Sequence, residues 1–143
     1  MRFSVLIKLL PSILLVACIS ATADTPSASE RGILSTKTVN LSSAVDIYFS
    51  DFTEAPKEST ATTLKNATQH DKRLLDKVFS NYELKVQYQN PYAVLLICSK
   101  DGRSAIMEDA GCSARIDRQV TSPAPCEFTL KVTQGCTVDG GDK

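Results

Sequence analysis

The 143-residue chain has no tryptophan, a single histidine and no net charge, because 16 basic residues balance 16 acidic ones. This balance excludes a polybasic nucleic-acid binder and makes long-range electrostatic steering of a partner weak. The chain also lacks a P-loop, a dinucleotide-binding fingerprint and any nucleic-acid-binding motif. We therefore expect no cofactor and no nucleic-acid partner. The length suits one small domain.

The apolar run near the N-terminus, Leu9–Ala17, is short and follows basic residues. A membrane-spanning helix needs about 20 apolar residues, whereas a basic start with a shorter apolar run is typical of a secretory signal peptide. Ala21–Ala23 offers the small residues that signal peptidase prefers, so cleavage before Asp24 would make residues 1–23 the signal peptide. An N-terminal anchor helix is the alternative.

A second cleavage site competes with this one at the end of the apolar run. The tetrapeptide Leu15-Val16-Ala17-Cys18 resembles the lipobox of bacterial lipoproteins. The resemblance covers the signal alone and implies that residues 1–17 are removed and that Cys18 becomes an acylated N-terminus. It further implies an acyl (palmitate) anchor in a lipid bilayer and, because Ile19 rather than an aspartate follows, sorting to the outer membrane with the domain facing the periplasm. Plain secretion or a free periplasmic protein is the alternative.

The rest of the chain divides by composition. Residues 24–42 are rich in Ser, Thr and Ala and show no hydrophobic period, so we expect a flexible tether there. Residues 43–137 hold the periodic apolar patterns and form the single predicted domain. Residues 138–143 are expected to be a frayed tail.

Four cysteines remain in the C-terminal third after Cys18 is set aside, namely Cys98, Cys112, Cys126 and Cys136. An even set in a small exported protein predicts two disulfides, with three possible connectivities. Loop-closure entropy mildly favours the neighbouring pairs Cys98–Cys112 and Cys126–Cys136. No C-x-x-C motif or clustered histidine supports a metal site or redox thiol, so we expect no metal.

Two helices are predicted at the start of the domain. Ser43 can cap the first, in which Val45, Tyr48, Phe49 and Phe52 recur at helical spacing, although a strand from residue 45 to 49 also fits. The second is expected from Pro56 or Ser59 to Ser80, with an apolar stripe of leucines, Val78 and Phe79.

After residue 80 the period changes to that of strands. Leu84, Val86 and Tyr88 alternate with polar residues, and Tyr92–Cys98 is a continuous apolar run that suits a central strand covered on both faces. Asn90-Pro91 predicts a turn between these two strands. Asp101-Gly102 predicts a type I′ hairpin, with Ser104–Glu108 as the returning strand.

A last alternating segment, from Cys126 to Thr133, predicts a final strand with Cys126 on its inner face. Helices followed by consecutive strands indicate an α+β fold. We expect two N-terminal helices packed on an antiparallel meander of three to four strands, in two layers and stapled by disulfides.

Few residues are candidates for catalysis. His70 lies in a charged stretch of the second predicted helix, and no G-x-S-x-G motif supplies a nucleophile. Asp71 falls on the apolar stripe, where Arg103, Arg115 or Arg118 could pair with it. Such an ion pair would hold helix to sheet; a solvated helix face and a functional carboxylate are the alternatives. We therefore predict no catalytic residues.

Acidic residues near the hairpin are weak candidates for metal ligands or glycosidase carboxylates. Asp101, Glu108 and Asp109 lack the spacing of a calcium loop. Glu108-Asp109 and Asp117-Arg118 flank the turn at Gly111-Cys112, but glycoside hydrolysis also needs a cleft for the sugar.

Recognition is therefore the favoured function. The long loop from Asp109 to Pro125 carries charges of both signs and contains two cysteines, and a pinned loop loses little entropy on binding. We predict a protein-binding module of the cell envelope, of inhibitor or immunity type, with an unknown envelope protein as partner. Its predicted binding residues are Glu108, Asp109, Arg115 and Arg118. A structural component of an envelope or secretion assembly and a small secreted hydrolase are the alternatives.

Overall fold

The computed structural model describes residues 25–140, in which helices precede an antiparallel sheet. The predicted signal peptide, the acylation site at Cys18 and the last residues of the predicted tail lie outside this range. None of the helices in residues 25–140 is both long enough and apolar enough to cross a membrane.

The first helix, α1 (Ala28–Phe49), begins fifteen residues before the predicted start at Ser43. Its N-terminus is a capping box, in which the Ser27 hydroxyl accepts from the Glu30 N–H (3.3 Å) and the Ser27 N–H donates to the Glu30 carboxylate (2.8 Å). This reciprocal pair satisfies two backbone donors that the first turn of a helix leaves free.

The extension of α1 corrects the predicted tether, because residues 28–42 are helical. Its buried face repeats every three or four positions and includes Leu34, Thr38, Leu41, Val45 and Phe49. Thr38 and Ser42, one turn further along the helix, interrupt the apolar period, so the sequence shows no helical pattern in this half of α1.

The second predicted helix is real but much shorter than expected. The structure has α2 (Thr60–Ala67), capped by Ser59, followed by two 3₁₀ turns, η1 (Lys72–Leu74) and η2 (Lys77–Asn81). The Asp71 and Asp76 carboxylates accept from the backbone two residues ahead, at Arg73 and Val78. Because aspartates favour such local caps over helix interiors, the continuous helix gives way to short turns.

The four-stranded sheet is an antiparallel meander in the order β1-β2-β3-β4, which confirms the α+β prediction. Its strands are β1 (Tyr82–Gln89), β2 (Tyr92–Ser99), β3 (Ala105–Asp109) and β4 (Arg118–Gln119). β1 and β2 pair without interruption from Tyr82↔Ser99 to Gln89↔Tyr92, around the predicted turn at Asn90-Pro91. β4 lies inside the segment that was predicted to be a loop.

The predicted hairpin between β2 and β3 forms, but not through a type I′ turn. Only Gly102 of the Asp101-Gly102 pair has a positive φ (70°), and the Gly102 N–H donates to the Ser99 carbonyl. The Asp101 carboxylate accepts from the Ser99 hydroxyl (2.6 Å) and the Arg103 N–H (3.1 Å), which stabilises the longer loop. The local aspartate bonds therefore replace the tight turn.

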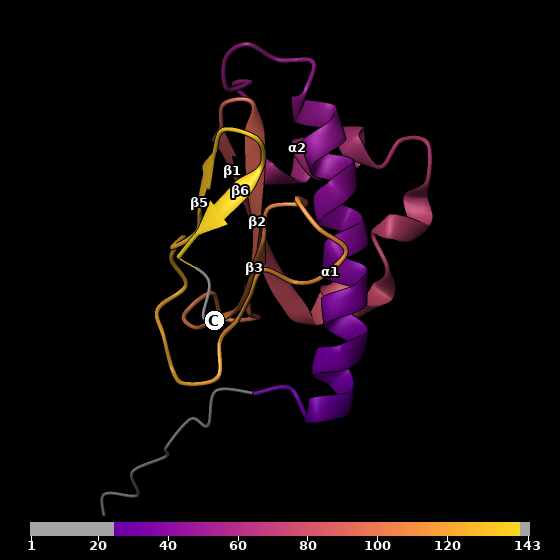
Figure 1. Ribbon diagram of the computed structural model, residues 1–143. Coiled ribbons are helices and arrows are strands. Elements are labelled where there is room, and N and C mark those ends of the chain that lie inside the picture. Colours follow the sequence, from indigo (N-terminus) through magenta and orange to yellow (C-terminus); the bar gives the residue numbers. More distant parts are fainter. Residues whose placement is uncertain (1–24, 141–143) are drawn as a thin grey trace, which may run out of the picture.

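Strand β2 is covered on both faces, as its apolar sequence predicted. Alternate residues such as Leu95 and Ile97 pack in the cluster that contains the buried face of α1. Leu96 and Cys98 point the other way, into a cluster with the C-terminal residues Cys126 and Phe128. Figure 1 shows the sheet between α1 and the C-terminal part of the chain. The domain thus has three layers rather than the two that were expected.

The predicted final strand is mostly irregular extended chain. Only β5 (Lys131–Thr133) is a strand, and it pairs with β6 (Thr137–Asp139) in a separate two-stranded sheet. The Gln89 side chain takes the place of a neighbouring strand: its amide donates to the Leu130 carbonyl (3.0 Å) and accepts from the Val132 N–H (2.8 Å). Residues 126–133 alternate between more and less buried side chains, as predicted. The Leu130 carbonyl and the Val132 N–H, however, bond to the Gln89 side chain and not to a neighbouring strand.

Two disulfides join the C-terminal layer to the rest, Cys98–Cys126 and Cys112–Cys136, which confirms their number and corrects their pairing. Cys98 pairs with Ala105 in the β2–β3 hairpin, whereas Cys112 lies three residues beyond Asp109, the last residue of β3 that pairs with β2. The stretch from Ala105 to Asp109 alone spans about 13 Å at the rise of a strand, whereas the Cα atoms of a disulfide lie within about 7 Å of each other. The hairpin therefore excludes the short-loop pairing.

Candidate functional site

The predicted binding loop forms one wall of a groove on the surface of the domain. The groove has a volume of about 730 Å³ and lies between α1 and residues 111–116. The α1 wall carries small polar residues at helical spacing, including Ser35, Asn40 and Ser43. Arg115 is the sole charged residue that lines the groove, and the rest of the lining combines hydroxyl, amide and backbone groups with the apolar side chains of Val39, Ala114 and Ile116.

The floor of the groove requires a glycine. Gly111 has a φ of 70°, and a Cβ there would lie 3.0 Å from the carbonyl oxygen of Ser42 and 3.2 Å from the Cα of Ser43. The neighbouring Asp109 carbonyl accepts from the Ser42 hydroxyl (3.0 Å). This close approach fixes the root of the loop against α1, and the Cys112–Cys136 disulfide holds it from the opposite side.

Beneath the loop, Glu108 is fully buried at the centre of a polar cluster. One carboxylate oxygen accepts from the Thr129 N–H (2.7 Å), and the other accepts from the Thr129 hydroxyl (2.6 Å) and the Arg118 guanidinium (2.9 Å). A carboxylate is stable in such a place only when a cation and several donors surround it. Glu108 thus ties β4 and the C-terminal layer to β3.

Asp109 and Asp117 cap each other's backbone at the two ends of the loop. Asp109 accepts from the N–H groups of Gly111 and Asp117 (3.1 Å each), and Asp117 accepts from the Ala110 N–H (2.8 Å). Burial raises the pKa of the Asp109 carboxyl to about 7, and the negative charge of Asp117 adds to this effect. The loop root is therefore built on a close pair of acidic groups.

The four predicted binding residues fall into two kinds. Arg115 is exposed and lines the groove. Glu108 and Asp109 are fully buried, and the Arg118 side chain is 12% exposed and engaged with Glu108. Because a buried side chain cannot touch a partner, Glu108 and Asp109 belong to the support of the loop rather than to its contact surface. The C-terminal layer covers Glu108 through Thr129, and α1 covers Asp109 through Ser42, which a loop interpretation of the sequence could not anticipate.

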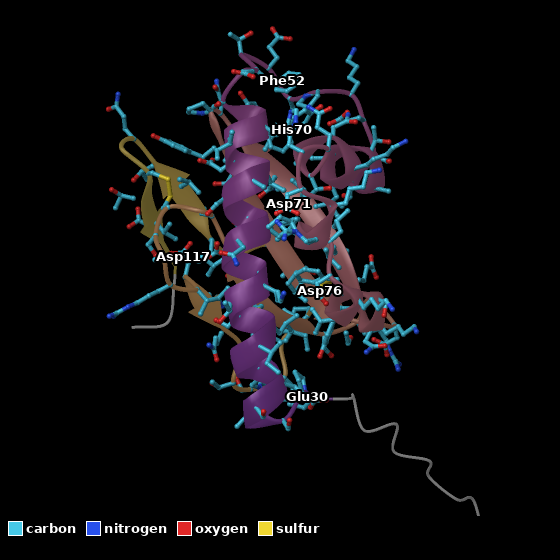
Figure 2. The ribbon with its side chains drawn as sticks, turned by 90° about the vertical axis from the view of Figure 1, so that its right-hand side faces the viewer. Glu30, Phe52, His70, Asp71, Asp76 and Asp117 are labelled. Atoms are coloured by element: carbon cyan, nitrogen blue, oxygen red, sulfur yellow. A yellow bond between two sulfur atoms is a disulfide. The ribbon has the colours of Figure 1, made fainter. Side chains whose placement is uncertain are left out.

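The two residues weighed for catalysis lie elsewhere. Figure 2 shows His70 and Asp71 on one side of α1 and Asp117 on the other. His70 is exposed, and its ring shares a hydrogen bond with the Gln69 amide (3.1 Å). The Asp71 carboxylate pairs with Arg73 (2.8 Å), not with an arginine of the sheet, so the predicted helix-to-sheet ion pair does not form.

Asp101, also weighed as a metal ligand, belongs to the hairpin loop. Hydrogen bonds from Ser99 and Arg103 lower the pKa of its carboxyl to about 2. Within residues 25–140 no group of three or more histidine, cysteine or acidic side chains is arranged to hold a metal ion.

The α1 wall of the groove was not predicted. Ser35, Asn40 and Ser43 lie in or next to the segment taken as a tether, where their polarity suggested loose chain. The capping box at Ser27 and Glu30 was the available signal, because it starts a helix early enough to include them.

No protein-family model, no curated protein and no solved structure matches this chain. The fold and site therefore define the chain only as an α+β domain with two disulfides and a groove beside a pinned loop. Disulfides of this kind suit an oxidising environment outside the cytoplasm.

Proposed function

We propose that this protein is an exported protein-binding module of the cell envelope and that the groove between α1 and residues 111–116 is its recognition surface. The observation that carries the proposal is that both walls of this groove are held in place by contacts within the fold. One wall is a capped 22-residue helix, and the other is a loop fixed by Gly111, Cys112 and the Asp109–Asp117 pair. A surface that is ordered before binding loses little conformational entropy in the complex.

The lining indicates what kind of group the groove accepts. Hydroxyl and amide side chains from α1 can donate to and accept from a polypeptide backbone, and Arg115 can pair with a carboxylate. A protein segment that presents an acidic side chain to Arg115 therefore fits best. An inhibitor or immunity-type protein, which blocks an envelope-acting enzyme by occupying it, is one form of such a module.

The proposed location is the periplasmic side of the outer membrane, with acylated Cys18 as the anchor. The lipobox-like sequence before Cys18 supports this location, and the two disulfides support an oxidising compartment. Because α1 begins at Ala28, the chain between the anchor and the domain is short, so the domain would be held close to the bilayer.

A photo-crosslinking residue placed at Val39, in the groove, tests the proposal in the native host. We expect a discrete crosslinked protein, identified by mass spectrometry, that is lost or reduced at least about tenfold when Arg115→Glu is added, since a charge-paired contact contributes about 1.5–3 kcal/mol. Lys57→Glu, on an exposed loop outside the groove, is the matched control and is expected to leave the product unchanged.

Equal loss with Lys57→Glu, or no product at Val39, would contradict the groove as the binding surface. The intact mass of the native protein separately tests the anchor, because a chain that starts at acylated Cys18 and one that starts at Asp24 differ by the lipid and six residues.

A further inference from the structure

We propose a second binding site at the free edge of β1, where an extended segment of a partner protein adds to the sheet as a fifth strand. This edge lies at the opposite side of the sheet from β4 and the groove. The site needs no acyl anchor and no groove contact, so its test is independent of the proposed function.

The direction of the backbone groups on β1 follows from its partner strand. The Ser99 N–H donates to the Ser104 carbonyl on the β3 side (2.8 Å), and the Ala93 N–H donates to the carboxylate of Asp46 on α1, so neither faces β1. The N–H and C=O groups of successive residues in a strand point to opposite sides, so those of Leu95 and Ile97 also point away from β1.

The residues of β1 opposite these positions therefore direct their N–H and C=O groups away from β2. They are Leu84, Val86 and Tyr88, paired with Ile97, Leu95 and Ala93. Within residues 25–140 no other backbone or side-chain group bonds to the outward groups of these three residues. The edge thus offers three donors and three acceptors in the spacing of a strand.

This edge lacks several of the features that block strand addition, although it carries the charged pair Glu83 and Lys85. Edge strands are commonly short, bulged or interrupted by proline, whereas β1 pairs regularly over eight residues. Tyr82, at its start, has its N–H bonded to the Phe79 carbonyl, which limits the free part to Leu84–Tyr88.

Hollows on both faces of the sheet flank the same part of β1. On the α1 face, a hollow of about 270 Å³ lies between Val86–Tyr88 and the Ala55–Thr63 segment, with Phe49 and Pro56 in its wall. On the other face, a hollow of about 370 Å³ lies between Gln87–Gln89 and Phe128–Lys131. Successive side chains of an added strand point to opposite faces, so they would enter these two hollows in turn.

The linings specify the side chains of the added strand. The α1-face hollow has an apolar part formed by Phe49, Pro56 and Val86 beside polar side chains such as Thr60 and Gln87. Its one carboxylate, Glu58, is already bonded to Tyr48, Thr63 and Asn66. The other hollow carries amides and the exposed Lys131, which forms no ion pair within residues 25–140. The occupant is therefore a strand in which apolar and acidic residues alternate.

A second copy of the chain fits this edge less well. Antiparallel pairing of two β1 strands about a twofold axis would bring the Ala55–Thr63 and Phe128–Lys131 segments of both copies to the same two faces of the junction. The space between these two segments of one copy can hold a single strand, but it cannot also hold the corresponding segments that cover the sheet of a second copy.

Amide exchange by NMR on the full mature protein tests the proposal with an end-capped octapeptide of alternating valine and glutamate. We expect exchange at Leu84, Val86 and Tyr88 to slow at least about tenfold with the peptide, as is usual when a free amide gains a hydrogen bond. The Lys85 and Gln87 amides, already bonded to β2, are expected to stay unchanged. A valine–lysine octapeptide is the matched control and is expected to give no protection.

Two variants make the result decisive. Val86→Pro removes an outward N–H without breaking a bond to β2 and is expected to abolish protection at Leu84 and Tyr88. Lys131→Glu leaves the edge intact and is expected to weaken peptide binding several-fold, whereas Lys100→Glu in the β2–β3 loop does not. The proposal is overturned if neither peptide protects the edge, if both protect it equally, or if the free protein already protects it in a concentration-dependent manner.

Discussion

The two faces of the sheet are covered in different ways. On one face, α1 buries an apolar stripe of Leu34, Leu41, Val45 and Phe49 against β2, and its backbone bonds are satisfied within the helix. On the other face, the chain from residue 121 to 140 has a single three-residue strand pair of its own. Two disulfides, the Gln89 amide and the Glu108 carboxylate hold this second layer to the sheet.

The difference shows how a small domain can cover a sheet with chain that has little regular structure. A helix needs only an apolar face, because its hydrogen bonds are internal. An irregular segment brings unsatisfied N–H and C=O groups to the interface, so buried polar side chains must bond to them and covalent links must fix their position. The α1 face should therefore survive changes that release the C-terminal layer.

The largest expected effect comes from Glu108→Ala. Removing this carboxylate leaves Arg118 and the Thr129 N–H without their partner inside the fold, which is expected to lower the free energy of unfolding by about 3–5 kcal/mol. Urea unfolding measures the loss. Glu127→Ala, at an exposed position on the same segment, is the control and is expected to change stability by less than about 0.5 kcal/mol. A loss below 1 kcal/mol at Glu108 would show that the polar cluster does not hold the layer.

Removing one disulfide is expected to have the next largest effect. Cys112→Ser with Cys136→Ser opens a link across 24 residues and is expected to cost about 2–4 kcal/mol. Amide exchange should then accelerate in the β5–β6 hairpin, while the amides of Leu95 and Ile97 in β2 stay protected. If the β5–β6 hairpin and β2 lose protection together, the layers unfold as one cooperative unit. That result would contradict the expectation that the α1 face survives the release of the C-terminal layer.

The third expected effect is a dependence of stability on pH, which comes from Asp109. Its folded-state pKa of about 7 lies above the ordinary value near 4, so the folded protein binds more protons than the unfolded chain between about pH 4 and 7. The free energy of unfolding therefore falls as pH rises through this window, by at most about 1.4 kcal/mol per pH unit, and levels off above it.

Urea midpoints at pH 5 and pH 8 measure this dependence, with the higher midpoint expected at pH 5. Asp109→Asn should flatten it. Asp101→Asn is the control, because the pKa of Asp101 is lowered to about 2 and its stabilisation is lost only below about pH 4. An unchanged slope in Asp109→Asn would assign the dependence to another group.

Part of the candidate site was predictable. The sequence identified the loop after β3 and the exposed Arg115, because loops pinned by cysteines present charged residues to solvent. It misplaced Glu108 and Asp109, since the C-terminal layer and α1 cover them and only the fold shows which residues face inward. It missed Ser35 and Asn40 because a polar face of a helix and a polar tether have the same composition.

The sequence alone determined the α+β class, the position of β1 to β3 and the number of disulfides. These features depend on local periodicity, on turn residues such as Asn90-Pro91 and on an even cysteine count, all of which are properties of short segments. The reach of α1 was also encoded locally, at Ser27 and Glu30.

Only the tertiary structure decided the disulfide pairing, the presence of a third layer and the fact that β1 is an edge strand without a second partner strand. The pairing follows from a hairpin register that separates Cys98 from Cys112, and the third layer from side chains such as Gln89 that bond to a backbone more than forty positions away in sequence. Contacts between such distant segments depend on which atoms the folded sheet brings within hydrogen-bond distance, and no local pattern specifies that distance.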